Sequence, residues 1–138
     1  MNGQFRLAQD VEKQDVGMAV LGWICHPAST GAKQLVVLEG TFPAGQGHGF
    51  HKHPDQEEVI YVVSGKIEQW IDREMRILGP GDAAFMPAGT VHASFNAGDG
   101  EARLLAVFGP SVGTGFDTID MAGDAPWSTL RAAEPVSG

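Results

Sequence analysis

The apolar residues of this chain fall into short runs, many of which alternate with polar residues, separated by turns rich in glycine and proline. Runs of this kind are typical of β-strands rather than helices. The pattern predicts strands over residues 16–25, 34–42, 48–53, 58–64, 66–72, 75–78, 83–86, 90–96 and 103–108. The chain contains 19 glycines, which agrees with an all-β fold with many tight turns.

Strand parity assigns faces within these runs, because successive side chains of a strand point to opposite sides. Gln69 and Ser94 are polar residues at otherwise apolar positions, which leaves open whether they face a cavity. We expect most aromatic side chains on the strands to pack in the core. This group is Phe42, Phe50, Tyr61, Trp70, Phe85, Phe95 and Phe108.

The composition of the chain limits the classes of protein to which it can belong. A chain of 138 residues with 43% hydrophobic and 19% charged residues can bury a core, so we expect one domain over residues 1–138. No apolar run approaches a membrane span, and the first residues do not resemble a secretory signal. The single cysteine excludes an intramolecular disulfide, so a cytoplasmic location is the default expectation. A net charge of −8 argues against nucleic acid or an anionic membrane as a partner.

Four residues carry the candidate chemistry. His51 and His53 are two residues apart, so a strand would present both imidazoles on one face. Glu58 opens the next apolar run after a turn and can fold back towards them, and His92 follows much later. Three imidazoles and one carboxylate suit one divalent transition ion such as iron, manganese, nickel or zinc.

A framework of glycines surrounds these four residues. One motif runs Gly45, His51, His53, Glu58, Gly65, and a second runs Gly81, Pro87, Gly89, His92, Asn96. In identity and spacing both resemble the two motifs of the cupin superfamily, so the chain is identified as a small single-domain cupin. The resemblance implies a double-stranded β-helix, or jelly-roll barrel, over about residues 33–110, with His51, His53, Glu58 and His92 as metal ligands.

The four framework glycines, Gly45, Gly65, Gly81 and Gly89, are expected at sharp turns with positive φ. The Asn96 amide is expected to tie a loop rather than to touch the metal.

The substrate pocket is less well defined by the sequence. His48 lies three residues before His51, so parity places it on the other face unless a bulge at Gly47 or Gly49 intervenes. It is either a rim histidine or a substrate contact. Met86 stands where many cupins line the pocket, although gap-filling is the usual role of methionine. Gln69, Ser94, His48 and Met86 are thus the candidate pocket residues.

Three functional classes fit these features. The first is a metal-dependent dioxygenase for a small organic molecule with an apolar part, since cupins include such enzymes. The second is an O₂-independent isomerase or decarboxylase, which needs an acid or base near the metal. Glu39 or Glu68 would serve only if it faced the site. The third is a non-catalytic module in which the metal orients a bound ligand.

An apolar segment outside the predicted barrel bears on whether two copies of the chain associate. Residues 16–24 are apolar, and an exposed apolar edge strand tends to pair with another chain, so we expect a homodimer. Burial of this segment within its own monomer is the alternative.

Residues 111–138 form a short extension in which Asp124 and Pro126 predict a helix through about Ala133. Trp127 and Leu130 would then dock on the barrel or cover its mouth.

Overall fold

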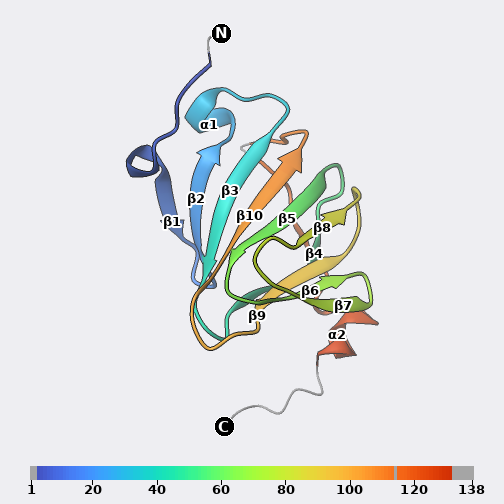
Figure 1. Cartoon of the computed structure of the whole chain (residues 1–138). Helices are drawn as coiled ribbons and strands as arrows, with labels where there is room; N and C mark the ends of the chain where they lie inside the picture. Colours follow the sequence, from blue (N-terminus) through green and yellow to red (C-terminus); the bar gives the residue numbers. More distant parts are fainter. Residues whose placement is uncertain (1–2, 114, 132–138) are drawn as a thin grey trace.

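The computed structural model describes residues 3–113 and 115–131, which form two antiparallel sheets facing each other (Figure 1). The first sheet has the order β1 (Glu12–Asp15), β2 (Val20–Cys25), β3 (Val36–Phe42), β10 (Ala102–Gly109), β5 (Glu57–Ser64), β8 (Ala83–Met86). The second has the order β11 (Ile119–Asp120), β4 (Gly47–Lys52), β9 (His92–Asn96), β6 (Ile67–Ile71), β7 (Glu74–Leu78). The predicted all-β jelly-roll architecture is confirmed, although no strand pair among the described residues closes the sheets into a barrel.

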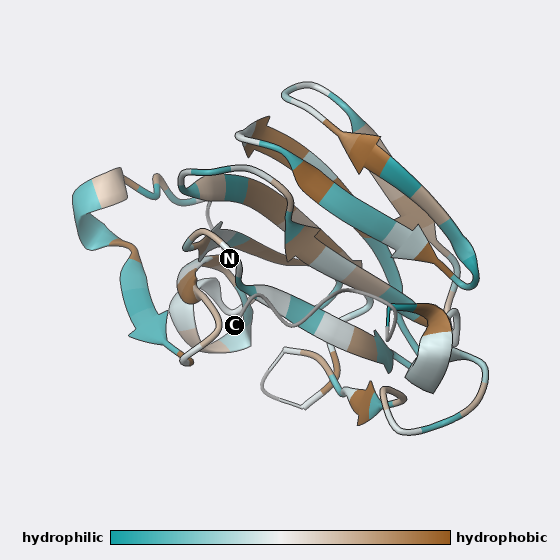
Figure 2. Ribbon diagram, turned by 90° about the horizontal axis from the view of Figure 1, so that it is seen from below, coloured by the Kyte–Doolittle hydropathy of each residue, from teal (hydrophilic) through white to brown (hydrophobic). Residues whose placement is uncertain are grey.

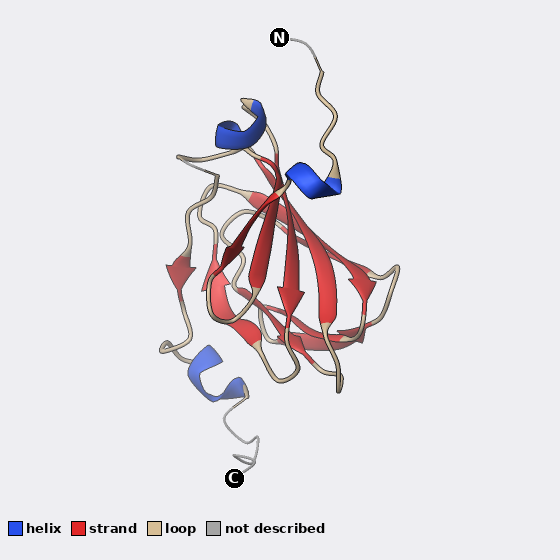
Figure 3. Cartoon of the chain, turned by 90° about the vertical axis from the view of Figure 1, so that its left-hand side faces the viewer, coloured by secondary structure: helices blue, strands red, loops and turns tan. Residues whose placement is uncertain are grey.

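The helices are short and lie at the periphery (Figure 3). They are the 3₁₀-helix η1 (Ala8–Asp10), α1 (Pro27–Thr30) and α2 (Trp127–Leu130). None of the helices in the described part of the chain is both long enough and apolar enough to cross a membrane.

The core lies between the two sheets, and alternate residues of β3, β5 and β10 are buried in it. Figure 2 shows hydrophobic and hydrophilic residues interspersed along the strands. β3 alternates buried and half-buried positions along its whole length, as the sequence pattern predicts. The buried apolar side chains of this core are Ala19, Val36, Leu38, Phe42, Ile60, Val62, Ile67, Ala84, Met86, Ala102, Leu104, Ala106 and Phe108. Asn96 ties the end of this core to its loops, because its amide donates to the carbonyls of Phe42 (3.0 Å) and Gly100 (2.8 Å).

The N-terminal segment differs from the sequence prediction. The expected strand over residues 16–25 begins only at Val20, because the chain turns back between Asp15 and Ala19. The amide of Gly17, at φ +90°, donates to the Asp15 carboxylate over 2.8 Å in this turn. β2 is then paired on both sides, with β1 and β3. The apolar segment is therefore not a free edge; the polar, exposed β1 occupies that edge instead.

Two aromatic residues also lie elsewhere than expected. Phe42, Phe50 and Phe108 are buried, but Tyr61 is 43% exposed and Phe85 is 52% exposed. Both point outward from the first sheet, because their strand neighbours Ile60 and Ala84, which are buried, occupy the inward positions.

The C-terminal extension covers the outer face of the second sheet. α2 is shorter than the predicted helix, and residues 132 and 133 lie outside the described residues. Trp127 and Leu130 pack against a cluster built on Phe50, Val91 and Ala93. Arg131 anchors the end of α2: its guanidinium donates to the Glu68 carboxylate over 2.6 Å and lies 3.6 Å from the centre of the Phe95 ring. α2 thus docks on the sheet, and neither Trp127 nor Leu130 lines the cavity between the sheets.

The four framework glycines have positive φ, as predicted, and two of them make a matched test of the turn geometry. Gly65 (φ +79°) and Gly45 (φ +77°) have nearly the same backbone. A Cβ on Gly65 would lie 2.9 Å from Ala102, whereas a Cβ on Gly45 would meet nothing within 4 Å.

Gly45→Ala should lower the free energy of unfolding by about 1–2 kcal/mol, the cost of the left-handed conformation alone. Gly65→Ala should cost at least about 1 kcal/mol more, because β10 must also shift. Urea denaturation measures both losses, and equal losses would contradict this packing.

Candidate metal centre

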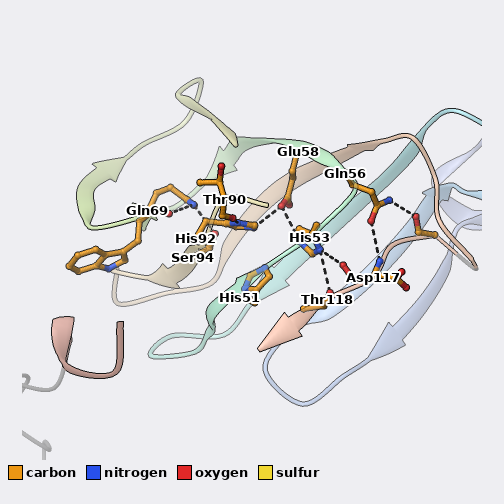
Figure 4. Close-up of polar contacts among 12 residues, drawn as sticks. His51, His53, Gln56, Glu58, Gln69, Thr90, His92, Ser94, Asp117 and Thr118 are labelled. Atoms are coloured by element: carbon orange, nitrogen blue, oxygen red, sulfur yellow. Dashed lines mark hydrogen bonds and ion pairs between the residues drawn. The ribbon is translucent and has the colours of Figure 1, made fainter. Parts of the chain in front are cut away.

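Four buried side chains from both sheets converge at one end of the core (Figure 4). His51 on β4 is paired directly with His92 on β9, so strand register places these two imidazoles side by side. His53 follows the end of β4, and Glu58 points inward from β5 in the opposite sheet. One ligand atom from each of the four residues lies within 4.8 Å of the others. Two atoms bound to one ion at about 2.1 Å each are at most about 4.2 Å apart, so a shift of a few tenths of an ångström by each ligand would complete a shell.

Backbone carbonyls set the orientation of the three imidazoles. The Nδ1 atom of His51 lies 2.6 Å from the Gly49 carbonyl, that of His53 lies 2.7 Å from the Asp117 carbonyl, and that of His92 lies 2.9 Å from the Thr90 carbonyl. A carbonyl oxygen only accepts hydrogen bonds, so each Nδ1 must carry the proton and donate it. Each Nε2 then presents a lone pair towards the centre of the cluster. A hydrogen bond from Nδ1 to a backbone carbonyl is a usual way in which the ring of a metal-binding histidine is held in place.

The inward atoms have no hydrogen-bond partner among the described residues. They are the Nε2 atoms of His53 and His92 and the Oε1 atom of Glu58, all buried. Glu58 Oε1 lies 2.8 Å from His92 Nε2 and 3.3 Å from His53 Nε2. Two lone pairs at such distances repel each other unless a proton or a cation lies between them. The donor set therefore fits a divalent ion.

The electrostatics of the site keep its ligands in the form that binds a cation. Burial alone would raise the pKa of Glu58, but its contacts with His53 and His92 outweigh burial and hold the pKa below its usual value. Burial also lowers the pKa of His51, and the neighbouring His48 and His92 lower it further. At neutral pH the site thus combines a carboxylate with a neutral imidazole at His51.

A buried glutamine supports the site from behind. The Gln56 amide donates to the carbonyls of Pro110 (2.7 Å) and Gly115 (2.8 Å), and its carbonyl accepts from the Asp117 amide (3.1 Å). Asp117 in turn holds His53 through its own carbonyl. Gln56 therefore fixes the loop that orients His53. Sequence reasoning missed this residue, because its partners lie more than fifty positions away along the chain.

A cavity of about 310 Å³ opens beside the cluster. Most of its lining residues are apolar, and neither lysine nor arginine is among them; all of the lining residues belong to the described part. The lining comprises His51, His53 and Glu58 together with Val16, Met18, Ala19, Leu21, Leu38, Gly40, Phe42, His48, Ile60, Ser94, Leu104, Ala106, Phe108, Phe116 and Thr118.

Two of the four candidate pocket residues line the cavity, and the other two lie elsewhere. His48 and Ser94 line the cavity. The register of β4 and β9 shifts between His48 and His51, so the two rings lie on the same side and stack with their centres 3.5 Å apart. Gln69 is buried but does not line this cavity, because its carbonyl accepts from the Ser94 hydroxyl over 2.6 Å. Met86 does not line it either, because it fills the core between the sheets.

The two acidic candidates for acid–base chemistry point away from the site. Glu39 lies on the outer side of β3, where it binds Arg103 over 2.8 Å. Glu68 lies on the outer side of β6, where it accepts from Trp70 and Arg131. His48 is instead the titratable side chain on the cavity wall beyond the cluster, among the described residues.

Part of the cavity wall comes from segments outside the predicted barrel. Val16 and Met18 belong to the turn between β1 and β2, and Phe116 and Thr118 precede β11. The sequence predicted a strand from residue 16 in the first segment and only an extension outside the barrel for the second. Nothing in these predictions placed these segments at the site, because their position beside the cavity depends on contacts between distant parts of the chain.

Comparison with known proteins agrees with this geometry. The family model of the cupin domain matches residues 31–108, more than half of the chain. The chain belongs to the cupin family. Quercetin 2,3-dioxygenase of Bacillus subtilis is 38% identical over 85 residues, which are 59% of this chain and 24% of the enzyme. Dimethylsulfoniopropionate lyase DddQ of Ruegeria pomeroyi is 42% identical over 53 residues, 38% of this chain and 26% of that protein. This cupin spans about a quarter of the length of each of these relatives.

Solved structures also resemble this cupin. KdgF from Halomonas sp. superimposes with a TM-score of 0.72 and 25% sequence identity, over 80% of this chain and 96% of that one. The cluster of His51, His53, Glu58 and His92 and the cavity thus lie in a fold shared along almost the whole of that protein.

The metal-free protein should lose stability as the pH falls from about 6.5 to about 4. Burial lowers the pKa of His48 to about 4, so below pH 6.5 the unfolded chain takes up a proton that the folded chain does not. The stabilisation is complete above about pH 6.5 and is lost by about pH 4, with up to about 3 kcal/mol from His48. The pKa of His51 is also lowered by burial, so His51 adds to the same loss of stability. Urea denaturation across this range measures the loss, and His48→Gln should make it shallower. An unchanged pH dependence in His48→Gln would contradict the burial of a neutral imidazole.

Proposed function

We propose that this cupin is a metal-dependent dioxygenase for a small organic substrate, with one divalent ion held by His51, His53, Glu58 and His92. The observation that carries the proposal is that these four side chains converge beside an apolar cavity. The similarity to quercetin 2,3-dioxygenase supports the reaction class. Iron, manganese, nickel and zinc all suit this donor set, so the identity of the ion is left to measurement.

The charge of the site indicates the form of the substrate. A bound divalent ion would supply Lewis acidity towards an enolic or acidic oxygen. Glu58 contributes one negative charge, and neutral imidazoles contribute none, so the loaded centre would carry one net positive charge. No lysine or arginine among the described lining residues adds to it. The centre therefore favours a singly ionised group over a dianion.

The cavity wall indicates the rest of the substrate. Side chains such as Leu38, Phe42, Leu104 and Phe108 exclude water and favour an apolar body. A volume of about 310 Å³ is at the small end of ligand sites. Ser94, Thr118 and His48 supply the few polar contacts. An enol, a catechol-like compound or a diketone combines these properties.

A second candidate is an O₂-independent lyase or isomerase. That chemistry needs an acid or base at the cavity, and the His48 imidazole occupies such a position. The local similarity to a lyase supports this alternative. A non-catalytic ligand-binding role is the third. A cytoplasmic location and a homodimer stay predictions from the sequence.

The purified protein should contain about one transition ion per chain when no chelator is used. His92→Ala should lower metal affinity by at least about 100-fold, because it removes a ligand and leaves Glu58 buried without its nearest partner. His26→Ala is the matched control, since His26 is also buried but stacks on Trp23 outside the cluster. Elemental analysis measures the content. Less than about 0.2 ion per chain, not restored by added iron, manganese, nickel or zinc, would contradict the site.

The metal-loaded protein should consume O₂ with an enol, catechol-like or diketone substrate in an oxygen-electrode screen. His92→Ala should abolish turnover while His26→Ala retains it. Equal conversion without O₂ would exclude a dioxygenase and support the lyase or isomerase. Tight binding of a compound that does not react would support the non-catalytic role.

A further inference from the structure

The segment that follows β10 passes the candidate metal centre and then crosses to the outer face of the second sheet. We name residues 115–131 the C-terminal strap. It contains β11, at the edge of the second sheet, and α2 (Figure 3). The first half of the strap contacts two of the candidate ligands, and the second half packs behind the strands that carry ligands.

The first half of the strap holds two of the four candidate ligands through its backbone. The Asp117 carbonyl accepts a hydrogen bond from the Nδ1 atom of His53 over 2.7 Å (Figure 4). Three residues later, Asp120 is paired with His51 across β11 and β4. The strap therefore limits how far the His53 ring and the end of β4 can move.

An aromatic contact fixes the strap against the core beside the same histidine. The Phe116 ring stacks on the Phe108 ring, with the ring centres 4.7 Å apart, and lies nearly perpendicular to the His53 ring at 5.6 Å. If the strap moved away, His53 would lose this neighbour and the acceptor of its Nδ1 proton. Without that acceptor the proton can lie on either ring nitrogen, and an Nε2 atom that carries it cannot bind a metal.

The second half of the strap packs against residues next to the other ligands. Trp127 and Leu130 contact the cluster of Phe50, Val91 and Ala93. Each member of this cluster directly precedes or follows a candidate histidine ligand in the sequence. Phe50 and Ala93 are buried on the outer side of the second sheet, because the strap and neighbouring aromatic residues cover them. The strap thus supports β4 and β9 from behind the site.

An ion pair fastens the end of the strap to β6. The Arg131 guanidinium donates to both oxygens of the Glu68 carboxylate, at 2.6 Å and 3.3 Å, and Trp70 donates to the same carboxylate over 2.7 Å. The guanidinium also lies over the Phe95 ring on β9. The side chains of Arg131 and Glu68 are only 27% and 15% exposed, so water screens this pair less than a fully exposed one.

We propose that the C-terminal strap is a positioning element whose docking on the second sheet is linked to metal binding. The docked strap supplies the carbonyl that fixes the His53 tautomer, and it supports β4 and β9. An ion at the site would hold the same histidines from the inner side, so each event favours the other. Arg131 is a positioning residue, because it acts on the ligands through the strap. The proposal rests on the metal site of the proposed function and not on the reaction.

Metal affinity tests one side of this linkage. The double variant Leu130→Ala/Arg131→Gln removes the ion pair and part of the apolar contact, and it leaves the candidate ligands and the lining of the cavity unchanged. Its affinity for Ni²⁺, measured by competition with a chelator, should fall about 10-fold, as is usual when a support of metal ligands is lost. Ni²⁺ is the probe because a site of nitrogen and oxygen atoms binds it more tightly than Mn²⁺ or Fe²⁺.

The matched control makes the same two changes on the first sheet. Arg103→Gln/Leu105→Ala alters β10, where Arg103 pairs with Glu39 over 2.8 Å and Leu105 is half-buried. Both double variants change the net charge equally, so a long-range effect of charge would appear in both. The control should bind Ni²⁺ as tightly as the wild type. Leu130→Ala/Arg131→Lys keeps a cation beside Glu68 and should recover part of the lost affinity.

Hydrogen exchange tests the other side of the linkage on the wild-type protein. Because linkage is reciprocal, Ni²⁺ should slow exchange across the strap by up to the same factor of about 10. Two amides report on it: that of Met121 donates to the Phe50 carbonyl over 2.9 Å, and that of Ser128 donates to the Asp124 carbonyl over 2.8 Å. Exchange in β1, at the edge of the first sheet, should stay the same.

Several results would overturn the linkage and leave the metal site in place. One is strap exchange that is the same with and without Ni²⁺, which decides the proposal even if the strap variant does not fold. Another is a folded strap variant in which the strap exchanges faster but the affinity for Ni²⁺ is unchanged. Equal losses of affinity in the strap variant and the control would also overturn it. A wild-type protein that takes up no Ni²⁺ would instead refute the metal site and the linkage together.

Discussion

The central constraint in this molecule is the burial of lone pairs that face one another. Backbone carbonyls hold the Nδ1 protons of His51, His53 and His92, which turns their Nε2 lone pairs inward. Glu58 adds a carboxylate oxygen 2.8 Å from one of these nitrogens. Leaving such atoms buried and unpaired costs about 1–3 kcal/mol each. A divalent ion removes the whole cost at once, because it accepts all four lone pairs.

The rest of the fold serves this geometry. The pairing of β4 with β9 aligns two ligands in one sheet, and β5 brings Glu58 from the facing sheet. Gln56 links the loop around Asp117 to the back of His53. The same alternation that turns Glu58 inward turns the neighbouring side chains of β5 outward. A single strand thus contributes both to the core and to the candidate metal centre.

Much of this arrangement could be predicted from the sequence. The strand pattern gave most strands within a few residues, since alternation and turn glycines are local signals. The spacing of the histidines and Glu58 within the cupin motifs indicated the cluster. The exposure of Tyr61 and Phe85 could not be predicted, because an aromatic residue on a strand has the same local signal on either face. The contributions of Gln56, Met18 and Thr118 also escaped, since they depend on contacts between segments far apart in the chain.

The candidate metal centre is tested most directly by identifying what is bound between His51, His53, Glu58 and His92. X-ray absorption spectroscopy at the edge of the bound metal reads its ligands directly. For an ion bound by these four side chains we expect a shell of three imidazole nitrogens and carboxylate oxygen, with nitrogen distances near 2.0–2.2 Å. Further oxygen from water is compatible with it. A shell that contains the sulfur of Cys25, the single cysteine of the sequence, or that lacks the imidazole signature would contradict it.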